Sequence, residues 1–137
     1  MRLLIAALLT ISAGSAATAA PGIAGNWLVQ DRTAVVTIAP CGNSLCGEIA
    51  KILVQKPDTP KTDIRNPDPA LRNRPFIGLR ILGGFTPTAR GWENGRIYDP
   101  KTGKSYKSEL RLNADGSLGV SGCIAFICKT QRWTRAR

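Results

Sequence analysis

The residues best suited to chemistry are four cysteines in two pairs with the same C-x4-C spacing, Cys41 with Cys46 and Cys123 with Cys128. An even number of cysteines predicts disulfides in an exported chain, whereas four thiolates in a reducing compartment predict a zinc site. The turn-forming residues 42–45 favour a hairpin that lets Cys41 and Cys46 face each other. We expect local bridges 41–46 and 123–128, with cross-pairing as the alternative, and no metal.

Few other side chains are placed for catalysis. The chain has no histidine, so the most common general base is missing. Glu48, Glu93 and Glu109 show no spacing typical of a glycosidase pair, and no nucleophile or phosphate-loop motif occurs. Asp63, Asn66 and Asp68 resemble a calcium loop, but capping of the local backbone explains them more simply. We therefore predict no catalytic residue, no cofactor and no enzymatic activity.

The N-terminus has the order of a secretory signal peptide. Arg2 precedes the apolar run 3–11, and small residues follow through Ala20. We expect a signal peptide over residues 1–19, with cleavage after Ala19 or Ala20, and a single domain over 20–137. The product would be periplasmic or secreted. Because no later stretch is long and apolar enough to cross a bilayer, we do not expect an integral membrane protein.

The chain is strongly basic, with 19 Lys and Arg against 9 Asp and Glu and a net charge of +10. The positive electrostatic potential of such a chain favours anionic partners. For an exported protein, these partners are anionic envelope components. There is no run of basic residues and little alternation of aromatic with basic residues, so nucleic acid is not an expected partner.

The body of the chain reads as short strands and turns, without a sustained helical period. Seven to nine strands at regular spacing predict a barrel or a sandwich. The expected strands cover residues 26–31, 33–40, 47–54, 76–82, 96–99, 105–113, 118–122 and 130–136. In the fourth of these, Ile77, Leu79 and Ile81 predict one aliphatic face, with Arg80 on the other.

One long connection interrupts this regular spacing of the expected strands. Residues 55–75 contain five prolines and almost no apolar side chains. Asp68 followed by Pro69 is typical of an N-cap and first helical residue. We expect an ordered loop with a single helical turn, laid over the barrel across one mouth, with disorder as the alternative.

The aromatic residues divide into two groups. In a closed barrel the first and last strands are neighbours, so Arg135 is expected to stack on Trp27 and, with Trp133, to close one end. The candidate ligand-binding residues come from more central segments: Arg80, Trp92, Tyr98 and Tyr106.

These same residues carry a family resemblance that spans the expected mature chain. Gly25-x-Trp27 with the late Arg135 is similar to the signature of lipocalins and their relatives. The chain more specifically resembles a bacterial family known as domain of unknown function 2147. The matching segments are Gly25-Asn26-Trp27, Cys41 with Cys46-Gly47, Asp63-x-x-Asn66-Pro67-Asp68, Pro75-x-x-Gly78, Trp92-x-x-Gly95-x-Ile97-Tyr98-Asp99-Pro100, Gly103-Lys104-x-Tyr106 and Trp133-Thr134-Arg135. The resemblance implies an exported, lipocalin-like antiparallel barrel of about eight strands with an unassigned biochemical role, and no catalytic residues can be carried over from it.

Two functions follow as hypotheses. The first is a non-enzymatic binding protein that holds a small apolar or amphiphilic ligand in the barrel. An anionic ligand is one variant of this hypothesis. The second is an interaction module of the cell envelope, which binds an anionic polymer or a partner protein through its basic surface. A carboxylate-based enzyme is the third and least supported class.

Overall fold

The computed structural model describes Ser12, Gly14 and residues 22–137. The predicted signal peptide therefore lies almost entirely outside the described residues, and its cleavage site remains a prediction. No helix in the described part of the chain is long and apolar enough to cross a membrane.

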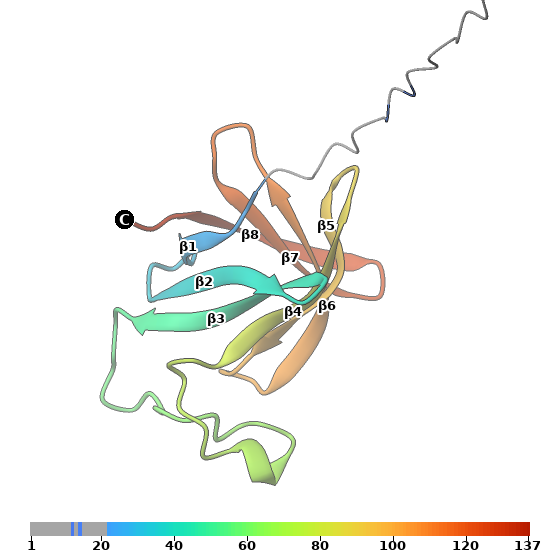
Figure 1. The fold of residues 1–137 in the computed structure, drawn as a ribbon. Helices are drawn as coiled ribbons and strands as arrows, with labels where there is room; N and C mark the ends of the chain where they lie inside the picture. The colour runs from blue at the N-terminus through green and yellow to red at the C-terminus, as the bar shows by residue number, and fades with distance from the viewer. Residues whose placement is uncertain (1–11, 13, 15–21) are drawn as a thin grey trace, which may run out of the picture.

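The fold is a closed barrel of eight antiparallel strands (Figure 1). Each strand pairs with the next one in sequence, and β8 pairs with β1. The strands are β1 (Gly25–Leu28), β2 (Ala34–Cys41), β3 (Ser44–Ile52), β4 (Arg80–Thr88), β5 (Gly91–Asp99), β6 (Lys104–Leu112), β7 (Leu118–Ile124) and β8 (Ile127–Arg135). The predicted antiparallel β-barrel is confirmed, and the sandwich is excluded.

This up-and-down order gives the barrel two different ends. The connections β1–β2, β3–β4, β5–β6 and β7–β8 lie at one end, which we call the loop end. The turns β2–β3, β4–β5 and β6–β7 lie with the chain termini at the other, the turn end. Both predicted disulfides are present, Cys41–Cys46 at the turn end and Cys123–Cys128 at the loop end.

The two disulfides differ in register. Cys123 lies directly opposite Cys128, with Cα atoms 4.1 Å apart. Cys41 instead pairs with Ser44, so its bridge to Cys46 runs diagonally over a Cα separation of 5.7 Å. The expected face-to-face arrangement of Cys41 and Cys46 is therefore wrong, although their pairing is right.

Strand β4 begins later than the sequence predicts. Gly78 has a φ of +84°, which ends the extended run before the strand starts, and Ile77 is 53% exposed. The register with β3 then shifts so that Ile81 is an extra residue on β4, and both Ile81 and Leu82 are buried. The predicted face holds for Leu79 and Ile81, which are buried on either side of the exposed Arg80, but it fails at Ile77, because a glycine turn precedes the strand and a β-bulge then interrupts the alternation.

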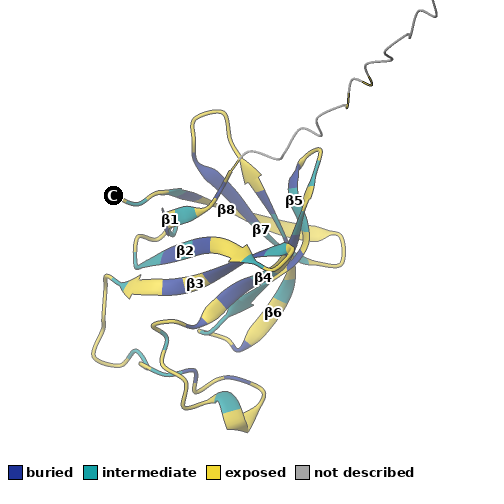
Figure 2. Ribbon diagram, in the orientation of Figure 1, coloured by how far each residue is buried: buried dark blue, intermediate teal, exposed yellow. Residues whose placement is uncertain are grey.

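The buried hydrophobic residues form one core cluster, and Figure 2 shows the buried positions distributed along the strands of the barrel. Its largest buried side chains are Trp27, Trp133 and Phe85. Phe85 packs directly over Gly95, where any side chain would overlap the phenyl ring. The interior is thus densely packed around Phe85.

The long β3–β4 connection has backbone hydrogen bonds of its own and a β-bridge between Thr62 and Pro75. It contains a single 3-10 turn, η1 (Pro69–Leu71), whose N-cap Asp68 accepts a hydrogen bond from the Ala70 amide. Figure 1 shows this loop extending away from the barrel beneath β3 and β4. The predicted cap and helical turn are therefore confirmed.

Candidate ligand-binding cavity

A cavity of about 630 Å³ lies within the loop end of the barrel. Seven of the eight strands contribute to its wall, together with the β1–β2 and β5–β6 connections. Its lining residues are Val29, Gln30, Asp31, Thr33, Ala34, Val36, Ile49, Ile81, Ile97, Tyr98, Asp99, Pro100, Lys101, Tyr106, Val120, Gly122, Ile124, Ile127, Lys129, Gln131 and Trp133. A cavity of this size suits one small organic ligand.

The long β3–β4 loop does not cover this cavity. None of its residues 53–79 belongs to the lining. The expectation that the loop lies across the mouth is therefore wrong. Its contacts instead anchor it beside the barrel, through Tyr98 and the β5–β6 connection.

The deep part of the cavity is apolar, since Val36, Ile49, Val120 and Trp133 are all buried. The Trp133 indole directs its only polar atom, Nε1, to Gln131 Oε1 at 2.9 Å. The interior wall is thus aliphatic and aromatic, and the N–H group of the Trp133 indole already has a hydrogen-bond acceptor. Such a wall favours the apolar part of a ligand.

The rim of the cavity is polar and carries two lysines. Lys101 pairs with Asp31 at 3.3 Å. Partial burial raises the pKa of Asp31, but hydrogen bonds from Thr33 and the nearby Lys101 outweigh it, so the net pKa is lowered. Asp31 therefore stays ionised and balances Lys101. Lys129 lines the same rim and forms no ion pair within the described residues.

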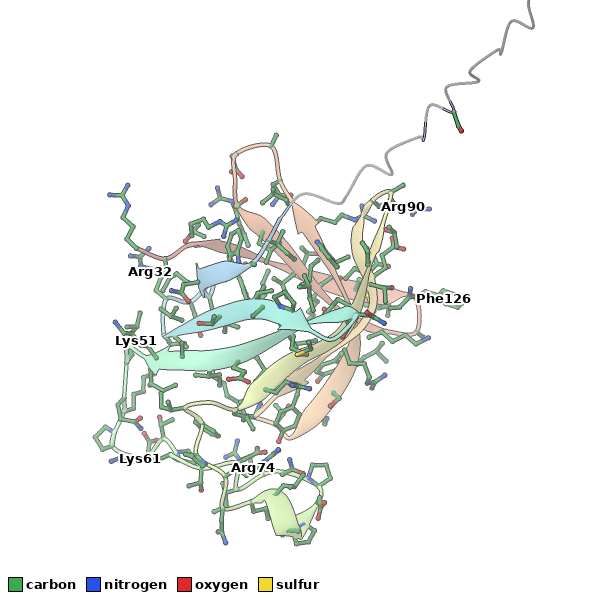
Figure 3. The ribbon with its side chains drawn as sticks, in the orientation of Figure 1. Arg32, Lys51, Lys61, Arg74, Arg90 and Phe126 are labelled. Atoms are coloured by element: carbon green, nitrogen blue, oxygen red, sulfur yellow. A yellow bond between two sulfur atoms is a disulfide. The ribbon has the colours of Figure 1, made fainter. Side chains whose placement is uncertain are left out.

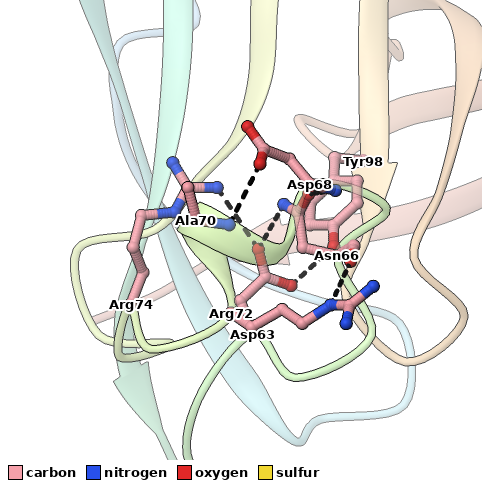
Figure 4. Close-up of polar contacts among 7 residues, drawn as sticks. All are labelled: Asp63, Asn66, Asp68, Ala70, Arg72, Arg74 and Tyr98. Atoms are coloured by element: carbon pink, nitrogen blue, oxygen red, sulfur yellow. Dashed lines mark hydrogen bonds and ion pairs between the residues drawn. The ribbon is translucent and has the colours of Figure 1, made fainter.

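Tyr98 connects the cavity to the long loop. Tyr98 belongs to the cavity lining, and its hydroxyl donates a hydrogen bond of 2.5 Å to Asp63 in the loop (Figure 4). Burial, followed by the bond to Asp63, raises the pKa of Tyr98 to about 12. The phenol is therefore protonated at neutral pH and acts as the donor.

Asp63 is the centre of the loop's polar network (Figure 4). It is fully buried, and it also accepts hydrogen bonds from Asn66 Nδ2 at 2.7 Å and from Arg74 at 3.2 Å. Asn66 Oδ1 in turn accepts from the Asp68 amide. These oxygens are engaged in local hydrogen bonds, so the capping interpretation is correct and the calcium interpretation has no support.

Comparison with known proteins agrees with this architecture. Residues 25–135 match the family model described as "Uncharacterized protein conserved in bacteria (DUF2147)". The chain belongs to this family. No curated protein matches the chain significantly.

A solved structure is similar to this DUF2147 protein throughout the barrel. It is described as "Protein HP1028 from the human pathogen Helicobacter pylori belongs to the lipocalin family". The two chains share 22% sequence identity with a TM-score of 0.74, over 85% of this chain and 84% of the other. The predicted lipocalin-like fold is therefore confirmed.

The cavity contains two of the four candidate ligand-binding residues. Tyr98 and Tyr106 line it, whereas Arg80 and Trp92 do not. Arg80 is exposed on the outer face of β4, where it lies opposite Glu48 of β3. Trp92 lies near the start of β5 at the turn end and packs against the core beside Leu110. Neither residue belongs to the wall that a ligand inside the barrel would contact.

Arg135 stacks on Trp27, as the sequence predicts. These residues pair across the β1–β8 seam, and the guanidinium lies 4.2 Å from the centroid of the indole. Arg135 also donates to the backbone carbonyls of Ala24 and Gly22. In this DUF2147 chain the Gly-x-Trp and late Arg signature is thus a structural clamp.

The sequence predicts for Trp133 only the closure of one barrel end. In the structure it also forms part of the cavity wall. Sequence reasoning also missed Lys129 and Gly122. Alternation along β8 is the signal that was available, since Ile127, Lys129, Gln131 and Trp133 occur at every second position and all line the cavity.

Proposed function

We propose that this protein binds a single-chain amphiphile, such as a fatty acid, with its apolar chain inside the barrel and its acidic group at the rim. The observation that carries the proposal is the division of one cavity into an apolar interior and a rim where Lys129, unlike Lys101, has no acidic partner among the described residues. A volume of about 630 Å³ is typical of protein sites that hold one small ligand. The lipocalin-like fold is compatible with such a role, and binding needs no catalytic group.

A substitution at Gly122 tests this proposal. Gly122 lines the cavity, and a Cβ there would meet Ile97 Cγ2 at 3.5 Å and Tyr106 Cβ at 3.7 Å, which are ordinary contacts. Gly122→Leu should therefore narrow the cavity without straining the backbone. We expect the purified wild-type protein to take up one palmitate in native mass spectrometry, and Gly122→Leu to lose most of that binding.

Gly83→Leu is the matched control. Gly83 pairs with the exposed Arg96, and a Cβ there would meet only Arg80 Cδ at 3.8 Å. The same substitution on this outer face should leave palmitate uptake unchanged. If wild-type protein takes up no amphiphile, or if Gly122→Leu binds as well as Gly83→Leu, the cavity is not the binding site.

We further propose that the protein acts outside the cytoplasm, in the periplasm or after secretion. Two disulfides and the N-terminal signal-like sequence support this location. Cell fractionation, with mass measurement of the N-terminus, tests it directly. Recovery of the uncleaved chain in the cytoplasm, with free thiols, would contradict it.

A further inference from the structure

The tip of the β7–β8 hairpin is the most exposed apolar feature of the described chain. Ile124 is 66% exposed, Phe126 is 102% exposed and Ile127 is 75% exposed. Figure 3 shows Phe126 projecting away from the barrel into open space. The directly opposed Cys123–Cys128 disulfide closes the base of this tip. The hairpin is therefore a constrained apolar protrusion, which costs free energy if it remains in water.

Basic side chains flank this protrusion. Arg96 of β5, Lys107 of β6 and Cys123 of β7 occupy one continuous register row on neighbouring strands. A shallow groove beside the tip is lined by Arg96, Lys104 and Lys107 together with Ile124 and Ala125, and no acidic residue lines it. The groove and the apolar tip thus form one surface.

The arrangement of charges in this groove is unfavourable without an anion. Arg96 and Lys107 lie directly opposite each other, and like charges at such a position repel. Within the described residues, neither side chain forms an ion pair. An anionic group in the groove would relieve this repulsion.

We propose that this surface docks on an anionic lipid bilayer, with Phe126 entering the interface and Arg96, Lys104 and Lys107 contacting lipid phosphates. A bilayer accepts a small convex apolar tip without a matching pocket, whereas a stable protein interface needs about 800 Å² from each partner. Basic residues beside an inserted apolar group are the arrangement that anionic membranes attract. The observations therefore favour lipid over a protein partner.

Docking in this way places the cavity at the membrane. Ile124 and Ile127 belong both to the tip and to the cavity lining. If the proposed amphiphile binding holds, the ligand would move between bilayer and cavity close to the lipid surface. The docking itself does not depend on that function, because Phe126 and the basic groove lie outside the amphiphile-binding cavity, apart from their shared border.

Vesicle binding tests the proposal. The purified protein is sedimented with vesicles made of equal parts phosphatidylglycerol and phosphatidylcholine, and with vesicles of phosphatidylcholine alone. We expect salt-sensitive binding to the anionic vesicles only. Removing two charges with Arg96→Gln/Lys107→Gln should lower the partition coefficient about 30-fold, and Phe126→Ser should lower it about tenfold.

Matched controls separate docking from general effects. Arg90 is an exposed arginine at the β4–β5 turn, at the turn end of the barrel (Figure 3). Arg90→Gln should change the partition coefficient less than about threefold. Ile77→Ser removes an apolar side chain that is 53% exposed in the long loop, outside the proposed docking surface, and should also have little effect.

A second measurement reports insertion itself. Phe126→Trp should show blue-shifted emission and quenching by brominated lipid on anionic vesicles, after subtraction of the wild-type signal. No binding to anionic vesicles would overturn the proposal. Binding that is equally strong with Phe126→Ser, or that is lost equally with Arg90→Gln, would also overturn it. Palmitate uptake measured on the same variants keeps failure of docking distinct from failure of the cavity.

Discussion

Tyr98→Phe isolates the contact that joins the long loop to the barrel. The substitution keeps the aromatic ring and removes only the hydroxyl that donates to Asp63 at 2.5 Å. A hydrogen bond to a charged group contributes about 1.5–3 kcal/mol, and Asp63 is fully buried, so water cannot readily replace the lost donor. We therefore expect the free energy of unfolding to fall by about 2 kcal/mol.

The raised pKa of Tyr98 adds a pH dependence to the stability of the protein. It is raised to about 12 in the folded protein, from a usual value of 10. The stabilisation is therefore complete below pH 10 and is lost as the pH rises toward 12, because only the unfolded phenol releases its proton in that interval. At 1.36 kcal/mol for each pH unit, this rise corresponds to at most about 2.7 kcal/mol. Burial of the phenol is the larger cause of this rise and the bond to Asp63 the second, so the hydrogen bond accounts for only part of that figure, and screening at the partly exposed ring reduces it further.

Urea unfolding of the wild-type protein and of Tyr98→Phe, at a series of pH values, measures both effects. The difference in unfolding free energy should be about 2 kcal/mol at pH 8 and should decline between pH 10 and pH 12. Tyr106→Phe is the matched control, because Tyr106 also lines the cavity but its hydroxyl has no hydrogen-bond partner among the described residues. A loss below about 0.5 kcal/mol for Tyr98→Phe, or one equal to that of Tyr106→Phe, would refute the role of the hydroxyl.

Three further changes test other parts of the structure. Arg135→Ala removes the stack on Trp27 and should lower the free energy of unfolding by about 1 kcal/mol in urea titrations, so an unchanged midpoint would contradict the clamp. Gly95→Ala should cost about 1–3 kcal/mol by the same measurement because its methyl group meets the Phe85 ring, and the loss should shrink in a Phe85→Leu background. Lys129→Gln should weaken binding of palmitate but not of the corresponding alcohol in competition titrations; an equal loss for both would remove Lys129 from head-group recognition.

Much of the architecture could be predicted from local patterns. Alternation identified β6, and turn residues identified the hairpin connection that ends at Gly103. The Asp68-Pro69 pair identified the cap of the only helical turn in the described chain. These features depend on neighbouring residues alone, so the sequence carries them directly.

Other features depend on residues far apart in the chain. The bulge at Ile81 is set by the register between β3 and β4, which no local pattern in β4 indicates. The same limit applies to the candidate site. Arg80 and Trp92 have suitable chemistry, but barrel closure places one on the outer face and the other at the turn end. Alternation along β8 places Lys129 and Trp133 on one face of the strand, but the sequence alone does not show that this face lines a cavity.

The seam between β1 and β8 has a consequence for how the barrel assembles and opens. It is the shortest pairing of the barrel, with only Trp27–Arg135 and Leu28–Thr134 in register. These residues come from opposite ends of the domain, so the seam has the largest loop-closure cost and should form last during folding. Backbone amides along β1 and β8 should accordingly exchange with solvent before those of the β2–β3 hairpin. The stack of Arg135 on Trp27 therefore stabilises the strand pairing that forms last and opens most easily.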